Sequence, residues 1–595
     1  MPASRITPNE ILGIRINPPE GVSHYCRREM RILTRLSNPT GDLCANVMSD
    51  ILENLKSMQK LRFFAPLLLL SSGLALAQQT EKVDLNTIHR IKEETLGRNS
   101  KVMDHMFYLT DVNGPRLNNS KGYRAAGEWA VKRLKEYGLA NVHLEKWGPF
   151  GKGWNLELYS GHMLEPMYQP IIAMPVAWTA GTNGVVSGNP MLVTPQTQAE
   201  LDAFKGKLAG KIVLISPKRD LEMVTTPLGV RYNDAELQEI QSAQIQMPGL
   251  FGRGGRGAPG AAGGRGGAAG GLSPMAIQNF LKEEKSALVI QISARGDGGT
   301  LFGGGAQNRD VTDNLPTLVM AAEHYNRIVR LIEHEIPVKL QFEIKVSFDD
   351  VDAFNVIAEL PGNAKKDELV MVGGHFDSWH YGTGATDNAA GSAIAMEVMR
   401  SLKSLNLNMD RTVRMALWGG EEEGLMGSRA YVKEHFADPT TMKPTAEHEK
   451  VAGYWNIDNG TGKVRGIYLQ GNDMCRPIFE RWLEPFRDLG VTTITSRNTG
   501  GTDHQAFDGV GIPGFQFIQD TMDYNTRTHH SNMDTYDRIQ ATDMMQMSAV
   551  EASMVYLTAV RPEKLPRKPL PPPQPAGRGG RGGAAGAPTA GRGGN

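Results

Sequence analysis

Cysteine is scarce in this sequence. Only three of the 595 residues are cysteine, at positions 26, 44 and 475. A disulfide scaffold and a zinc ribbon held by cysteines both need several thiols close together, so both are excluded. Any bound metal ion would therefore rely on histidine and carboxylate ligands.

Net charge is absent as well. The 64 Lys and Arg residues balance the 64 Asp and Glu residues, so no overall field attracts nucleic acid or anionic lipid. Segments 252–272 and 577–594 have a Gly/Arg spacing typical of some RNA-binding tails, but the neutral charge and the export signal described below argue against a nucleic-acid partner. The length and the 40% of hydrophobic residues predict a buried core and two or more domains.

Several common catalytic motifs are also missing. The sequence has no G-x-S-x-G elbow for a serine nucleophile and no H-E-x-x-H helix for a zinc ion. Gly382 and Gly384 resemble the start of a dinucleotide-binding loop, but Asp387 places a negative charge where the pyrophosphate would lie. We therefore predict neither a serine hydrolase nor a nucleotide cofactor.

Long apolar runs are limited to one segment near the N-terminus. Residues 58–62 include the basic Lys60 and Arg62, residues 63–77 are mainly apolar, and Ala75-Leu76-Ala77 resembles a cleavage site. The apolar part is shorter than the ~20 residues of a membrane-spanning helix. We interpret 58–77 as a signal peptide for secretion or export to a periplasm, without stable membrane insertion. Residues 1–57 would then be an upstream extension from a misassigned start codon, the alternative being a genuine cytoplasmic leader.

The remaining chain divides into four segments. Residues 82–159 combine helical patterns with a strand, and 160–345 contain short β runs that indicate an inserted β-rich domain with the Gly/Arg-rich loop 252–272. Residues 346–560 alternate strands and helices, as in an α/β domain with parallel strands. Residues 561–595 are rich in Pro, Gly and Arg and are predicted to be a disordered tail.

Periodicity predicts individual elements of the α/β domain. Apolar runs at 369–373 and 413–418 suit strands buried on both faces, and 388–405 has the pattern of a helix between them. An earlier helix has one apolar face, is capped by Asn119-Ser120 and ends at Gly138. The residues of that face are Tyr123, Ala126, Ala130, Leu134 and Tyr137.

Polar residues gather after the predicted parallel strands. Taken singly, each has a structural explanation: Glu421–Glu423 would form a solvated acidic turn, and Asp387 and Asp458 would cap helices or turns. Their recurrence at one sheet edge, where α/β proteins bind ligands, favours a shared site. The set comprises His375, Asp377, Asp387, Glu421, Glu422, Asp458, His529 and His530. The set offers two or more imidazoles and at least three carboxylates without thiolates, which suits Zn²⁺. Five such ligands are too many for one zinc ion and suit two ions ~3.5–4 Å apart.

The combination of these motifs resembles the M28 family of zinc exopeptidases, in its carboxypeptidase Q-like branch. The resemblance spans about residues 100–545, and the insertion resembles a protease-associated (PA) domain. It implies a zinc-exopeptidase fold, a phosphorylase/hydrolase-like mixed sheet flanked by helices with an inserted β-rich PA domain. The motifs are Gly374-His-Phe-Asp-Ser-Trp379, Gly384-Ala-Thr-Asp387, Glu421-Glu422, Asp458-Asn-Gly-Thr461, Gly501-Thr-Asp503 and His529-His-Ser531.

The resemblance also implies the ligands of two zinc ions. His375 and Glu422 would be terminal ligands on opposite ions, and Asp387 would bridge the two. Asp458 and His530 would complete the ligand set. His530 is chosen over His529 because family members place the ligand histidine four residues before an acidic residue, which here is Asp534. Family members also have a cis peptide bond after the bridging aspartate.

Three further residues receive catalytic or supporting roles from the resemblance. Glu421 would be the general base that takes a proton from the bridging water and passes it to the leaving amine. The Asp377 carboxylate would accept the second N–H of His375 and fix its tautomer. His529 would either donate a hydrogen bond to the oxyanion or be purely structural.

The predicted function is therefore a secreted dizinc metallo-exopeptidase of short peptides or dipeptides. Two alternatives stay open: a single-zinc glutaminyl cyclase, and a catalytically silent binding module. The sequence does not decide between aminopeptidase and carboxypeptidase action, and a homodimer is expected only because it is common among relatives.

Overall fold

The computed structural model describes residues 81–242, 272–306 and 308–573. The predicted extension 1–57, the signal peptide 58–77, almost all of the Gly/Arg-rich loop and the last part of the tail lie outside these residues. In the described ranges, no helix has the length and apolar character needed to cross a bilayer.

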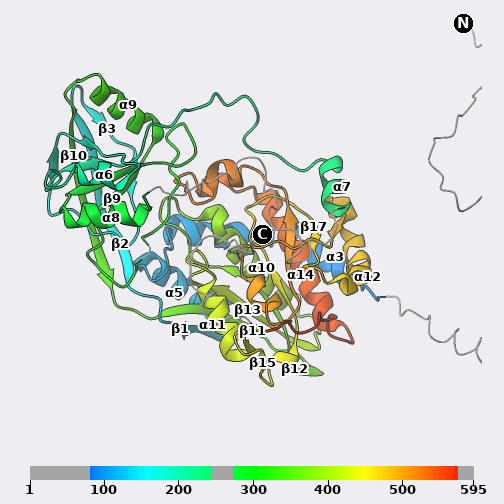
Figure 1. Cartoon of the computed structure of the whole chain (residues 1–595). Helices are drawn as coiled ribbons and strands as arrows, with labels where there is room; N and C mark the ends of the chain where they lie inside the picture. Colours follow the sequence, from blue (N-terminus) through cyan, green and yellow to red (C-terminus); the bar gives the residue numbers. More distant parts are fainter. Residues whose placement is uncertain (1–80, 243–271, 307, 574–595) are drawn as a thin grey trace, which may run out of the picture. The chain divides into compact units, whose positions relative to one another are not determined.

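An eight-stranded mixed sheet organises the α/β part (Figure 1), with the strand order β1-β11-β13-β12-β16-β19-β17-β18. Its central strands β13, β12, β16 and β19 are parallel, as the buried apolar runs predicted. The strand bounds are β1 Ala140–Trp147, β11 Ala353–Leu360, β12 Lys365–His375, β13 Arg411–Trp418, β16 Val451–Asn456, β17 Val464–Tyr468, β18 Thr493–Thr495 and β19 Gly514–Gln519.

The register aligns the carboxyl ends of the central strands. His375, the last residue of β12, pairs with Trp418, the last residue of β13. On the other side of β12, Gly373 pairs with Asn456, the last residue of β16. Segments that follow these strands therefore start from one edge of the sheet, as predicted.

Helices cover both faces of this sheet because both faces are apolar. Along β12, Val370 and Val372 join one core, whereas Met371 between them joins the other. The first core also holds α3 Leu85–Leu96, α4 Val102–Phe107, α5 Lys121–Glu136, α10 Ala390–Ser404, α12 Arg476–Leu483 and α14 Ala541–Val560; the second holds α11 Met426–His435 and α13 His504–Asp508.

Short elements connect the longer ones. They are η2 Tyr108–Val112, η3 Ala385–Ala389, η4 His448–Lys450, η5 Asp473–Cys475, η6 Glu484–Leu489, η7 Tyr524–Thr528 and η8 Tyr536–Arg538, with the small pair β14 Ala437–Asp438 and β15 Lys443–Pro444. The predicted helix from residue 388 begins at Ala390, since Asp387 and Asn388 have non-helical backbone angles in η3.

Local sequence explains the ends of α5. The Ser120 hydroxyl accepts a hydrogen bond from the Tyr123 N–H at 3.2 Å and so caps the first turn. After the last turn, Gly138 has φ +73°, a conformation that glycine adopts without steric cost. Both ends were predicted.

Two smaller sheets form the insertion. One has the order β3-β2-β10-β5 and the other β4-β9-β8-β7-β6, and the two share an apolar core with α9. The bounds are β2 Gly153–Glu165, β3 Gln169–Pro170, β4 Ala173–Pro175, β5 Val186–Gly188, β6 Met191–Leu192, β7 Ile212–Leu214, β8 Leu288–Ile292, β9 Thr317–Met320, β10 Lys339–Asp349, α6 Gln198–Asp202, α7 Asp234–Ser242, α8 Pro274–Glu283 and α9 Ala322–Glu333. Strands β2 and β10 extend a few residues beyond the predicted range 160–345; the inserted domain with those bounds and its PA type stay predictions.

The described part of the predicted tail is packed. Leu565 is buried in the core that includes β16, and the Arg567 guanidinium donates to the carbonyls of His448 and Val451 at 2.7 Å. Around Leu565 and Arg567 the chain therefore packs on the α/β part rather than being disordered. The prolines of this segment exclude helix and strand hydrogen bonding but do not prevent burial.

One buried carboxyl in the core gives a stability prediction. Glu551 on α14 is fully buried, and within the described residues neither of its carboxyl oxygens has a hydrogen-bond partner. Burial holds the pKa of Glu551 well above its ordinary range. As the pH rises above the ordinary carboxyl pKa, the unfolded chain loses this proton before the folded protein does, so the free energy of unfolding falls. We expect Glu551→Met to raise it by about 1–3 kcal/mol at neutral pH, with a smaller gain at pH 4.

Urea unfolding at pH 4 and pH 7.5 would measure this effect. The matched control is Glu397→Gln on α10, where the buried carboxylate accepts two hydrogen bonds from Arg400 at 2.8 Å. The control should destabilise the protein because it removes the charge that accepts two of the Arg400 hydrogen bonds and leaves Arg400 paired with Glu94 alone. A Glu551→Met protein less stable than wild type at pH 7.5 would contradict the prediction.

Candidate metal centre

The eight predicted site residues meet at one edge of the sheet. Each follows a strand of the parallel centre: His375 ends β12, Glu421 and Glu422 follow β13, and Asp458 follows β16. Asp387 lies in η3 between β12 and α10, while His529 and His530 follow η7, in the segment after β19. The shared edge arises because the parallel strands bring their carboxyl ends together.

The first group of donor atoms surrounds His375. Its Nε2 lies 3.2 Å from Asp387 Oδ1 and 3.3 Å from Asp458 Oδ1. All three side chains are buried, and one donor atom from each lies within 4.8 Å of the others. One imidazole and two carboxylates at these separations are suited to a single zinc ion.

The second group lies on the other side of Asp387. His530 Nε2 is 2.9 Å from Glu422 Oε2 and 3.3 Å from Asp387 Oδ2. His529 Nε2 is 3.7 Å from the same Asp387 oxygen, and Asp387 can hold a cation together with the two histidines. Asp387 thus belongs to both groups, one oxygen directed to each.

Unpaired buried oxygens test whether cations fit here. Asp387 Oδ2, Glu422 Oε1 and Asp458 Oδ1 are buried without a hydrogen-bond partner in the described residues. Within those residues no lysine or arginine forms an ion pair with these carboxylates; their charged partners are histidines. Several buried carboxylates without a compensating charge are costly, so the donor set fits divalent cations.

The pKa shifts in the cluster reflect the same excess of buried negative charge. Burial raises the pKa of Glu421 and of Glu422 well above the ordinary range, and neighbouring carboxylates raise it further. Burial alone would lower the pKa of His375, but Asp458 and Glu421 outweigh it and raise that pKa. Burial lowers the pKa of His529 to about 3, with His530 acting in the same direction.

Glu421 lies beside the first donor group but is not part of it. Its Oε2 is 3.9 Å from His375 Nε2, and the side chain is 9% exposed. The Glu421 N–H and the Glu422 N–H each donate to the Asp377 carboxylate at 3.2 Å. The loop is thereby fixed with the Glu421 carboxylate toward the cluster.

Asp377 supports His375 differently from the predicted contact. The Asp377 backbone carbonyl lies 3.0 Å from His375 Nδ1 and accepts its N–H, whereas the nearest carboxylate oxygen is 3.7 Å away. The carboxylate is occupied by the two N–H groups of the Glu421 loop. Asp377 still orients the imidazole, but through its main chain.

Sequence reasoning missed two residues of this region. The Tyr524 hydroxyl donates to Asp387 Oδ1 at 2.9 Å, and its ring stacks on His529. The buried Asp534 carboxylate accepts the backbone N–H of Asp387 at 3.2 Å. No motif marks Tyr524, whereas the spacing of Asp534 from His530 served only to choose the ligand histidine. The peptide bond Asp387–Asn388 is cis, as the resemblance implied.

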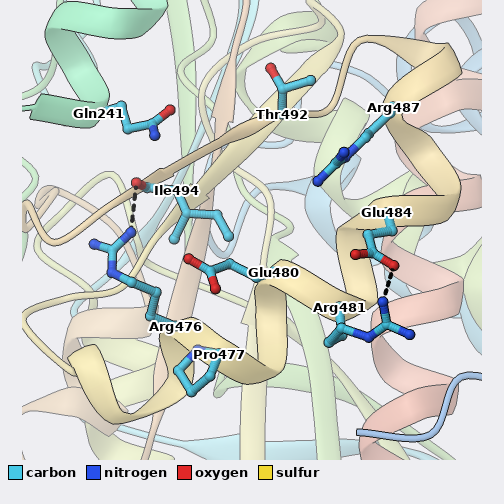
Figure 2. Close-up of a pocket in the computed structure, with 9 residues that line it drawn as sticks. All are labelled: Gln241, Arg476, Pro477, Glu480, Arg481, Glu484, Arg487, Thr492 and Ile494. Atoms are coloured by element: carbon cyan, nitrogen blue, oxygen red, sulfur yellow. Dashed lines mark hydrogen bonds and ion pairs between the residues drawn. The ribbon is translucent and has the colours of Figure 1, made fainter. Parts of the chain in front are cut away.

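A cavity elsewhere on the surface holds none of these residues. Figure 2 shows it between α7 and the α12–η6 region, with a volume of about 390 Å³. In its charged lining Arg481 pairs with Glu484, and Arg476 pairs with Asp473. The lining comprises Gln241, Arg476, Pro477, Glu480, Arg481, Glu484, Arg487, Thr492 and Ile494.

Comparison with known proteins identifies the domain that carries the cluster. Residues 355–555 match the profile of Peptidase family M28. The chain carries an M28 peptidase domain. All eight site residues, from His375 to His530, lie inside the M28 match, and the predicted family is confirmed.

Relatives of the M28 domain extend the match beyond it. Carboxypeptidase Q of Homo sapiens is 25% identical over 467 residues, which cover 78% of this chain and 86% of that protein. A peptidase M28 precursor from Shewanella amazonensis has a similar fold, with a TM-score of 0.58 and 24% identity over 82% of this chain and 98% of that chain. BSAP, a zinc aminopeptidase from Bacillus subtilis, has a TM-score of 0.50 and 16% identity over 78% of this chain and 95% of that chain. The predicted mixed sheet flanked by helices is thereby confirmed.

Proposed function

We propose that this M28 peptidase is an exopeptidase that uses two zinc ions to hydrolyse short peptides. The observation that carries the proposal is Asp387, whose two oxygens face separate donor groups. One group holds His375 and Asp458, the other Glu422 and His530. The histidines favour zinc over magnesium or calcium, and the relatives include carboxypeptidase Q and a zinc aminopeptidase.

His530 rather than His529 is the proposed ligand. His530 Nε2 lies within 3.3 Å of two carboxylates, whereas His529 reaches only Asp387, at 3.7 Å. His529 stacks on Tyr524 instead. Its lowered pKa of about 3 leaves it neutral at pH 7 with one N–H to donate, which supports the role of an oxyanion donor.

The residues of the site would have separate roles in the reaction. Bound zinc ions would supply Lewis acidity for the peptide carbonyl and lower the pKa of water. Glu421 would take the proton of the attacking water and pass it to the leaving amine, so no covalent intermediate with the protein is needed. Asp377 would orient His375 through its backbone carbonyl and fix the Glu421 loop through its carboxylate.

We further propose export of the protein and a restricted substrate length. Export is supported by the signal-like sequence 58–77. The restriction is supported by the insertion, whose residues 301–303 contact the segment of His530 and Asn532. Because these residues border one side of the metal centre, they would limit the length of a substrate that can enter. Such a limit favours dipeptides and short peptides over folded proteins.

A panel of dipeptides tests this function. We expect purified protein to cleave free dipeptides, to fail on either the N-blocked or the C-blocked analogue, and to leave folded proteins intact. Chelation should abolish turnover, and added Zn²⁺ should restore it. Failure on the N-blocked analogue would indicate aminopeptidase action, and failure on the C-blocked analogue would indicate carboxypeptidase action.

Two outcomes would contradict the proposal. Turnover that survives complete metal removal would exclude the zinc mechanism, and equal rates on folded proteins and dipeptides would exclude the length restriction. Cyclisation of an N-terminal glutamine with one ion per chain would indicate the glutaminyl cyclase alternative.

A further inference from the structure

The segment that carries His529 and His530 is bordered by the insertion on two sides. We call residues 520–532 the histidine loop. In contrast to His375 and Asp458, which lie at or next to strand ends, these histidines are ten or more residues beyond the end of β19. Their placement therefore depends on what the histidine loop packs against.

Residues 228–232 of the insertion hold the start of the histidine loop. Val230 and Met522 form a β-bridge, with N–H to carbonyl distances of 3.1 and 2.8 Å in the two directions. The Arg231 guanidinium is 3.0 Å from the buried Asp520 carboxylate, which also accepts the Tyr232 N–H at 3.0 Å. In Figure 1 the adjoining α7 lies beside α12 and β17, separated from the other insertion helices by extended chain.

Residues 293–303 of the insertion hold the other end. The Arg295 guanidinium donates to the backbone carbonyls of Asn525 at 3.1 Å and of His529 at 3.0 Å, and it lies 4.1 Å from the centre of the Phe302 ring. The Gly303 N–H donates to the His530 carbonyl at 3.2 Å. Both histidines of the loop are thus hydrogen-bonded to the insertion through their main chains.

The backbone of His530 shows why such support matters. Its φ is +60°, the left-handed region that non-glycine residues avoid at a cost of about 1–2 kcal/mol. A residue in this region persists only where its surroundings enforce it. The donors to the His529 and His530 carbonyls, Arg295 and Gly303, come from the insertion.

We propose that Arg295 is a positioning residue for the zinc ligand His530, so that the insertion sets the affinity of one of the two metal ions. The proposal rests on the proposed dizinc function. It assigns unequal stability to the two ions: one is held by the sheet edge, and the other depends on the insertion. Loss of the Arg295 hydrogen bonds should release the second ion and leave the first.

Arg295→Met tests this, because methionine keeps an apolar stem against Phe302 but removes both donors. Zinc per chain would be measured after dialysis against buffers of graded free Zn²⁺. We expect wild type to retain two ions and the variant one over a range of free zinc, with the second dissociation constant weakened about 10–100-fold. Amide hydrogen exchange in 520–532 should be faster in the variant, with or without metal.

The control is Arg327→Met, an insertion arginine on α9 that donates to Gln169 at 2.6 Å and forms no hydrogen bond to the described histidine loop. It should keep both ions and wild-type exchange. If Arg295→Met does not fold, Arg295→Lys, which keeps one donor group, takes its place with the same expected direction.

Unchanged affinity for the second ion would overturn the proposal. If wild type itself binds fewer than two ions, the dizinc function fails; hydrogen exchange then decides the positioning role alone, where faster exchange supports it and unchanged exchange overturns it.

Discussion

Replacing Glu421 by glutamine should nearly abolish peptide hydrolysis while the protein keeps both zinc ions. Glutamine has the shape of glutamate but cannot accept the proton of the attacking water. A positioned general base contributes about 10²–10⁴-fold, so we expect kcat to fall by that factor. Zinc content should not change, because the Glu421 carboxylate is 3.9 Å from His375 and outside both donor groups.

Its two neighbours provide the controls. Glu422→Gln should lose zinc as well as activity, because Glu422 contacts His530 at 2.9 Å. Glu423→Gln should keep most of the activity, because Glu423 is buried in the same loop but forms no ion pair with a histidine of the described cluster. Kinetics and elemental analysis of the three proteins would separate base from ligand. A Glu421→Gln enzyme with wild-type kcat would contradict the assignment.

The placement of the cluster follows from sequence because it requires only local patterns and one topological rule. The apolar runs before His375 and Glu421 fixed two buried strands, and parallel strands share their carboxyl edge. Asp458 follows a third strand of the same set. The shared carboxyl edge therefore predicted that His375, Glu421 and Asp458 lie close together.

Contacts made across long separations in the chain could not be predicted in this way. Tyr524 donates to Asp387 from 137 residues away, and Arg295 reaches His529 from 234 residues away. Neither residue belongs to a periodic pattern or a spaced motif. The same applies to Arg567, whose guanidinium fixes residues predicted to be disordered. Composition describes a segment by itself and does not reveal the surface that it covers.

Asp387→Asn should remove more function than the loss of any terminal ligand, because it affects both donor groups. The amide nitrogen cannot ligate zinc, so one of the two facing oxygens is lost and the negative charge with it. We expect zinc to fall from two ions to one or none. Loss of metal catalysis is worth several kcal/mol, which corresponds to about 10³-fold or more in kcat/KM. Elemental analysis and kinetics on a dipeptide would measure both effects.

Variants of the surrounding ligands also test whether Asp387 serves both donor groups or only one. His375→Ala and His530→Ala should each lose one ion, from opposite sides, whereas Asp387→Asn weakens both. Asp503→Asn is the matched control. Asp503 is a buried aspartate whose charge raises the pKa of Glu421, and within the described residues it forms no ion pair with a histidine. Its variant should keep two ions. If Asp387→Asn loses no more zinc than His530→Ala and keeps the ion held by His375 at full affinity, the aspartate serves one site only. The two donor groups would then be independent, and a bridged pair of ions could not be the source of catalysis.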